Sequence, residues 1–271
     1  MRRVTWCALA AMTLFVVGCK TKQPETESKP AESAKVESPA PAPAPPPTPS
    51  ETKPATSEPM AAPAPAAKAG NLLKPATLNE KAPEKYEVKF KTTRGDFTLE
   101  VTRAWAPLSA DRFYNLVRGH FFDDTAFFRV VPGFVVQFGI SGKPAVSAAW
   151  KNVNIMDDPN TQTNKRGTIT FAQTSEPNSR GTQVFINLKD NGRLDHYGQG
   201  FAPFGVVEGD GMNVVEMMYE GYGDNAGPDQ AQIEKQGTPY LKKGWPKLDY
   251  IVSASIVGAP AAPAAASKKV Q

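Results

Sequence analysis

One arginine and one glutamine stand at fixed spacing inside an apolar run at residues 127–139. The run reads Phe-Phe-Arg-Val-Val-Pro-Gly-Phe-Val-Val-Gln-Phe-Gly, so Arg129 and Gln137 lie among phenylalanines and valines. An unpaired guanidinium in apolar surroundings costs free energy, so we expect Arg129 to have a task there. Arginine stays charged at any working pH and donates hydrogen bonds in a fixed fork. The run therefore predicts a fixed cationic donor beside an apolar surface.

Other chemistries find little support in the sequence. His120 and His196 are the only histidines, and neither has metal-ligand spacing to carboxylates. We interpret the aspartate pairs at 123–124 and 157–158 as turns, and the Gly-Asp-Gly at 209–211 lacks the context of a phosphate loop. The net charge is +4, and no basic cluster is interleaved with aromatic residues, so we expect no nucleic-acid partner. No metal or cofactor is expected.

The elements that must position Arg129 and Gln137 are mostly short strands. Period-two alternation at 86–92 and 97–102, with Arg94-Gly95-Asp96 between them, predicts a hairpin. Further strands are predicted at 126–131, 134–139, 167–173, 184–188, 202–207 and 250–257. Many short strands with few helices are typical of an antiparallel barrel and not of βαβ units.

Two helices are predicted between these strands. The first runs from Pro107 to Gly119, with Ser109 as its N-cap and an apolar face of Phe113, Leu116 and Val117. The second runs from about 212 to 219, with Val215 and Met218 on its apolar face. The segment 222–247 is longer than a simple turn, and its residues assign it no role.

The chain divides into four parts by composition. Residues 1–18 pair two arginines with a short apolar run, which is typical of a secretory signal. Residues 19–70 contain no aromatic residue and half of the 26 prolines, and we interpret them as a disordered spacer reaching about 150 Å when extended. A ligand for a proline-binding module is the alternative. Residues 71–257 form the folded domain, and 258–271 form a second Ala/Pro-rich tail.

Two cysteines, Cys7 and Cys19, are present, so no disulfide framework is expected after removal of the signal. The sequence Val16-Val17-Gly18-Cys19 resembles the lipobox of bacterial lipoproteins, which implies acylation of Cys19 and a membrane anchor. The alternative is an ordinary signal with a chance cysteine. Lys20 after the acylated cysteine favours the outer membrane, facing the periplasm.

Several blocks in the folded part resemble the cyclophilins, a family of peptidyl-prolyl isomerases. The run at 127–139 is similar to the family's Phe-His-Arg, Pro-Gly-Phe and Gln-Gly-Gly signature. The blocks that follow in family order are Gly-Thr-Ile-Thr-Phe-Ala at 167–172, Asn-Ser-Arg-Gly-Thr-Gln-Val-Phe-Ile at 178–186, Leu-Asp at 194–195 and Phe-Ala-Pro-Phe-Gly at 201–205. The resemblance implies a closed eight-stranded antiparallel barrel capped by two helices.

The resemblance also implies the roles of individual residues. Arg129 would be the catalytic arginine, and Gln137 would contact the substrate backbone and help to hold Arg129. The proline pocket would comprise Phe134, Val135, Phe185, Leu194 and Phe201. The groove for residues that precede the proline would be lined by Phe171, Ala172, Gln173 and Gln183.

Several positions depart from the family pattern, among them the following four. Phe128 replaces the histidine before the arginine, Phe138 replaces the first glycine of Gln-Gly-Gly, Val135 is shorter than the usual methionine, and Phe201 takes the place of a pocket histidine. The first three of these departures keep a second hypothesis open, a proline-peptide binding or chaperone module with little turnover. The leading hypothesis is a monomeric isomerase acting on proline-containing envelope or secreted proteins.

Overall fold

The computed structural model describes residues 71–258 of the chain. The predicted signal, Cys19, the linker and residues 259–271 of the predicted tail lie outside this range. The elements are, in chain order, η1 (Pro75–Thr77), β1 (Lys85–Thr92), β2 (Gly95–Thr102), η2 (Arg103–Trp105), α1 (Pro107–Arg118), β3 (Arg129–Val131), β4 (Val135–Phe138), α2 (Pro144–Trp150), β5 (Thr168–Phe171), β6 (Val184–Asn187), η3 (Gly192–Asp195), β7 (Gly205–Val207), α3 (Gly211–Val215), α4 (Gln230–Gln236), α5 (Thr238–Gly244) and β8 (Ile251–Ile256).

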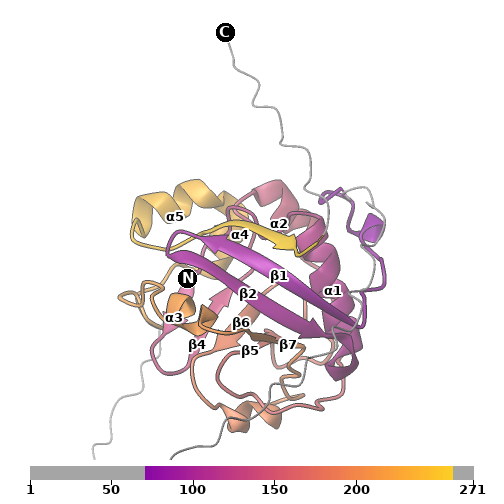
Figure 1. Ribbon diagram of the computed structural model, residues 1–271. Coiled ribbons are helices and arrows are strands. Elements are labelled where there is room, and N and C mark those ends of the chain that lie inside the picture. The colour runs from indigo at the N-terminus through magenta and orange to yellow at the C-terminus, as the bar shows by residue number, and fades with distance from the viewer. Residues whose placement is uncertain (1–70, 259–271) are drawn as a thin grey trace, which may run out of the picture. The chain divides into compact units, whose positions relative to one another are not determined.

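All eight strands belong to one sheet, which Figure 1 shows strongly curved. Its order is β3-β4-β6-β5-β7-β2-β1-β8, and every strand pair is antiparallel. The prediction of a mainly β fold with eight antiparallel strands is therefore confirmed. The end strands β3 and β8 are not paired in this order, although Ala126, before β3, forms a bridge with Tyr250, before β8. Closure of the sheet into a barrel stays a prediction.

The first hairpin forms where the alternation places it. Val88 and Phe90 of β1 are fully buried between exposed neighbours, because successive side chains of a strand point to opposite faces. The turn differs slightly from the prediction. Thr92 pairs with Gly95, so Gly95 already belongs to β2, where its φ of +135° favours glycine.

Helix α1 confirms the predicted helix but corrects its N-cap. The cap position is Ala106, and Ser109 lies within the first turn. The buried carboxylate of Asp158 accepts from Ser109 N and Oγ at 2.7 Å each, and from Leu108 N at 2.9 Å. A carboxylate suits this place because the first amides of a helix lack partners and carry partial positive charge. The side chain that caps the start of α1 is therefore that of Asp158, which is distant in sequence, and not that of Ser109.

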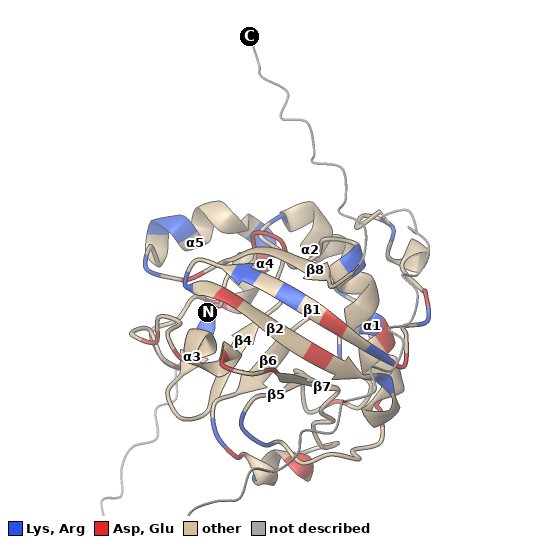
Figure 2. Cartoon of the chain, viewed as in Figure 1, with Lys and Arg blue, Asp and Glu red and all other residues tan. Residues whose placement is uncertain are grey.

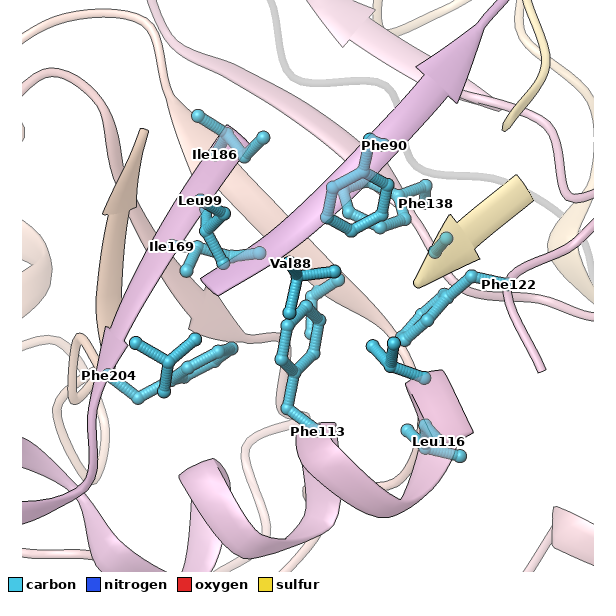
Figure 3. Packing of buried hydrophobic residues seen from close by; sticks show 14 of the residues in the cluster. Val88, Phe90, Leu99, Phe113, Leu116, Phe122, Phe138, Ile169, Ile186 and Phe204 are labelled. Atoms are coloured by element: carbon cyan, nitrogen blue, oxygen red, sulfur yellow. The ribbon is translucent and has the colours of Figure 1, made fainter. Parts of the chain in front are cut away.

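The main core lies between the sheet and α1. Figure 3 shows Phe90, Phe113, Phe122 and Phe138 gathered at its centre. Phe90 lies 5.9 Å from Phe138 and 6.4 Å from Phe122 between ring centroids, in tilted or edge-on contacts that aromatic rings favour. The predicted apolar face of α1 is confirmed, since its three residues are at most 1% exposed.

The second predicted helix is shorter than expected. Helix α3 ends at Val215, and Val215 and Met218 are both buried as predicted. Three helices were not predicted: α2, and then α4 and α5 within the segment 222–247, where α4 packs against both others. A second apolar cluster, separate from the main core, holds α4 and α5 to the sheet and comprises Ala126, Phe128, Ile140, Ile233, Leu241 and Leu248.

Figure 2 shows charged residues along β1 and β2. In β1 the residues that alternate with the buried ones are exposed, so the outer face of the first hairpin is charged. Lys89 pairs with Asp96 at 3.0 Å, and Lys85 pairs with Glu100 at 3.4 Å. Lysines also mark the end of α5. None of the helices within 71–258 is long and apolar enough to cross a bilayer.

Candidate active site

The candidate site is built on one face of three neighbouring strands. Arg129 of β3 lies opposite Gln137 of β4, and Gln137 lies opposite Phe185 of β6. Residues one position along, such as Val136 and Ile186, are fully buried in the main core. Strand side chains alternate between faces, so the register that packs the core also brings Arg129, Gln137 and Phe185 together on the opposite face.

Arg129 is held by two hydrogen bonds. Its Nη1 donates to Gln137 Oε1 at 3.0 Å, and its Nε donates to Asp224 Oδ1 at 2.6 Å. The hydrogen bond from Arg129 lowers the pKa of the Asp224 carboxyl below its ordinary value, so this carboxylate is ionised at neutral pH. The Arg129 side chain remains 27% exposed, which leaves it accessible from solution.

Gln137 connects this arginine to the next strand. The residue is only 7% exposed, and its Nε2 donates to Gln183 Oε1 at 2.8 Å. The amide of Gln137 thus accepts from the arginine on one side and donates to Gln183 on the other. Both ends of a buried amide are satisfied, which fixes its orientation.

Beside Arg129 lies a small apolar cluster that is separate from the main core. It contains four buried residues, with two partly buried ones packed against them: Val135, Phe185, Leu194 and Phe201, then Phe134 and Ala172. The rings of Phe185 and Phe201 meet at 5.4 Å in an edge-on contact. This cluster contains all five residues predicted for the proline pocket.

Phe134 forms the rim between the cluster and two cations. The guanidinium carbon of Arg129 lies 5.8 Å from the ring centroid, and that of Arg193 lies 5.1 Å from it. Such distances allow favourable cation–π contacts. The ring therefore stands at the border between the apolar cluster and the arginine.

A buried network of asparagines, which the sequence analysis did not identify, supports this apolar cluster. Asn191 donates to Phe134 O at 2.9 Å and to Asn187 Oδ1 at 2.8 Å. Asn187 donates to Asn164 Oδ1 at 3.1 Å, and Asn164 donates to Phe201 O at 2.8 Å. The backbones of Phe134 and Phe201, two members of the apolar cluster, are thereby joined through the interior.

A polar groove of about 290 Å³ lies next to Gln137. Its lining includes Ala172, Gln173 and Gln183, as the resemblance implies, together with Gln137. Phe171 is different, because its side chain is fully buried against Phe204 in the main core. Strand alternation places Phe171 on the core face, so its side chain does not line the groove, which corrects that part of the prediction.

The departures from the family signature are accommodated by packing. Phe138 is fully buried on the core face of β4 and leaves the strand regular. Phe128 is 3% exposed and belongs to the second apolar cluster, next to the segment that carries Asp224.

The sequence analysis did not identify Asp224, since nothing in its local sequence indicates a partner 95 residues away. Within 71–258 no group of three or more His, Cys, Asp or Glu is arranged to hold a metal ion.

Comparison with known proteins agrees with this geometry. Residues 87–238 match the family described as cyclophilin type peptidyl-prolyl cis-trans isomerase/CLD. Peptidyl-prolyl cis-trans isomerase A of Dickeya dadantii is 38% identical over 146 residues, covering 53% of this chain and 76% of that protein. Peptidyl-prolyl cis-trans isomerase B of Escherichia coli is 34% identical over 134 residues, covering 48% and 81%.

Among solved structures, a cyclophilin type isomerase of Cryptosporidium parvum is 19% identical with a TM-score of 0.48, covering 65% of this chain and 99% of that one. The family match spans more than half of the chain, and the relatives are matched over most of their length. The chain belongs to the cyclophilin-type peptidyl-prolyl cis-trans isomerases.

Proposed function

We propose that Arg129 and Gln137 carry the isomerase reaction of this domain, with the adjacent apolar cluster as the proline pocket. The observation that supports this most directly is the position of a fixed cation, tied to Gln137 at 3.0 Å, at the rim of an apolar cluster separate from the core. The peptide bond before proline rotates slowly because the C–N bond has partial double-bond character, with a barrier of about 18–20 kcal/mol.

Catalysis of this rotation breaks no covalent bond. The site must bind the twisted peptide better than either planar form. The ring of the substrate proline is held by Phe185, Leu194 and Phe201, while the guanidinium of Arg129 donates to the imide nitrogen or carbonyl oxygen as resonance is lost. A donor that is already in place is effective because it needs no rearrangement when the charge changes.

The polar groove next to Gln137 receives the substrate residues that precede the proline. Gln183 lines this groove and accepts from Gln137, so occupancy of the groove is coupled to the orientation of the catalytic amide. The proposed substrates are proline-containing polypeptides in extended conformation. A binding module with little turnover would use the same pocket without dependence on Arg129.

Hydrogen bonds to the chain around the start of β8, at the other end of the sheet, stabilise the chain just before β3, the strand that carries Arg129. Asp124 N donates to Ile251 O, and Phe127 N donates to Asp249 O, each at 2.9 Å. These contacts support closure of the sheet into a barrel, in which β3 would not be a free edge.

The same proposal places the domain on a membrane. Acylation at Cys19 and the spacer 19–70, inferred from the sequence alone, would hold the isomerase on the periplasmic side of the outer membrane as a monomer. Envelope and secreted proteins would be its clients. Labelling of cells with a radioactive fatty acid tests the anchor: label that persists in a Cys19→Ser variant would contradict it.

The catalytic proposal is tested by a protease-coupled isomerisation assay on a short X-Pro peptide. We expect the purified chain to be active and its Arg129→Ala variant to lose at least about tenfold in kcat/KM, with an unchanged circular dichroism spectrum. Full activity of the folded variant would refute the role of Arg129. Peptide binding without turnover in the unaltered chain would favour the binding module.

A further inference from the structure

The segment 220–248 includes residues 222–247, to which the sequence assigned no role, and it reaches the catalytic arginine. Asp224 in this segment accepts from Arg129 Nε at 2.6 Å. Together with Gln137 Oε1 on Nη1, this contact gives the guanidinium two anchors on different elements. Nη2 of Arg129 makes no hydrogen bond to any residue within 71–258, so both of its N–H groups are left for a substrate.

The segment is fixed to the sheet by its own apolar contacts. Ile233, Leu241 and Leu248 are at most 6% exposed, and they pack in the second apolar cluster. Phe128, which directly precedes Arg129 in the chain, is a member of the same cluster. The segment and the arginine are therefore anchored at neighbouring points, and rigid anchoring is what a positioning contact requires.

Local hydrogen bonds fix the backbone on both sides of Asp224. Gly223 N donates to Glu220 O at 2.9 Å, and Ala226 N donates to Tyr222 O at 3.1 Å. Trp245 Nε1 then ties the turn to the end of α5 through Ala226 O at 2.8 Å. Asp224 is thus presented to Arg129 from a turn that is bonded before and after it.

We propose that Asp224 is a positioning residue, which holds Arg129 Nε while Gln137 holds Nη1, so that Nη2 is presented to the peptide bond. This inference rests on the proposed role of Arg129. An arginine side chain has several rotatable bonds, and one anchor leaves the plane of its fork free to turn. The second anchor fixes that plane, and small errors in the placement of a catalytic group are costly in rate.

The contact is unlike a stabilising ion pair. The Asp224 side chain is 54% exposed, and exposed ion pairs contribute little to folding stability. Its loss should therefore change the reaction more than the fold. Asp224 could instead act only as a counter-ion that weakens the positive charge of Arg129. In that case, removal of the Asp224 carboxylate would raise activity.

The test compares Asp224→Ala and Asp224→Asn in the full chain with a matched control, Glu220→Gln. The Glu220 side chain is exposed in the same turn, and the change removes one negative charge without any described side-chain contact. We expect Asp224→Ala to lower kcat/KM about tenfold, mainly through kcat. Asp224→Asn keeps an acceptor and should stay within about threefold of the unaltered chain, as should Glu220→Gln.

A second readout does not depend on turnover. The Nε–H signal of Arg129 in a ¹⁵N NMR spectrum should be protected from exchange in the unaltered chain and in Asp224→Asn, and should lose protection in Asp224→Ala. The double variant Arg129→Ala/Asp224→Ala should be no slower than Arg129→Ala alone, since Asp224 acts only through the arginine.

The outcomes separate the two proposals. An active Arg129→Ala variant would refute the role of the arginine itself. An inactive Arg129→Ala together with a fully active Asp224→Ala would refute positioning only. Higher activity in both Asp224 variants would overturn positioning in favour of an inhibitory counter-ion.

Discussion

Gln137 Nε2 donates to Gln183 Oε1 at 2.8 Å while Gln137 Oε1 accepts from Arg129. We predict that Gln137→Leu lowers kcat/KM by about tenfold or more, because Arg129 loses one of its two anchors and Gln183 loses its donor. Gln137→Glu keeps an acceptor for the arginine and should retain more activity. The isomerisation assay measures both, and equal activity of Gln137→Leu and the unaltered chain would contradict the prediction.

Phe171 and Phe185 lie on adjacent strands but on opposite faces of the sheet. Phe171→Ala should cost about 3–5 kcal/mol of unfolding free energy, with KM of the folded fraction unchanged, because its ring fills the main core. Phe185→Ala should raise KM for an X-Pro peptide, because its ring belongs to the pocket cluster. Urea titration and peptide kinetics on both variants distinguish the two faces, and a raised KM in Phe171→Ala would show that the assignment is wrong.

Asp158 is 4% exposed and accepts three hydrogen bonds at the start of α1. Asp158→Ala should lower the unfolding free energy by about 2–4 kcal/mol, since it leaves buried amide donors unpaired at the helix terminus. Asp158→Asn should cost less because it keeps an acceptor. Denaturant midpoints test this, and a change in Asp158→Ala below about 0.5 kcal/mol would rule out the capping role.

Burial, followed by the charges of Glu87 and Glu100, raises the pKa of Glu208 above its ordinary value of 4.5. A carboxyl whose pKa is raised in the folded state binds its proton more tightly there, so the charged form destabilises the fold above that pKa. Glu208→Gln should therefore melt at a slightly higher temperature than the unaltered chain at pH 7. The difference should disappear well below pH 4.5. Calorimetry across this range checks the sign, and a lower melting temperature at pH 7 would refute it.

The sequence predicted correctly those elements in which the local residue pattern matches the face that is buried in the fold. Alternation in the first hairpin is confirmed because β1 has one buried and one solvated face. The pocket residues were identified through the resemblance and do lie together, yet Phe171 was placed on the wrong face. Strand β5 reads Thr-Ile-Thr-Phe, and this alternation groups Phe171 with Ile169, which also lies in the main core. The placement of Phe171 in the groove came from the resemblance and not from this alternation.

Long-range partners explain the remaining differences. Ser109 has the residue type of an N-cap, but the cap is supplied by Asp158 from a distant loop. Helices α4 and α5 have seven residues each, too few for a clear helical period, and they are stabilised by packing in the second apolar cluster. Asp224 depends on that packing, so its contact with Arg129 follows only from the folded chain.

The shared register of β3, β4 and β6 has a consequence for how this enzyme can diverge. One residue inserted into or deleted from β4 would turn Gln137 toward the core and Val136 toward the pocket, so it would damage folding and catalysis together. Substitutions are tolerated in this strand, as Phe138 shows. Changes in length should instead accumulate in connections such as 220–248, where new contacts to the arginine can arise without disturbing the sheet.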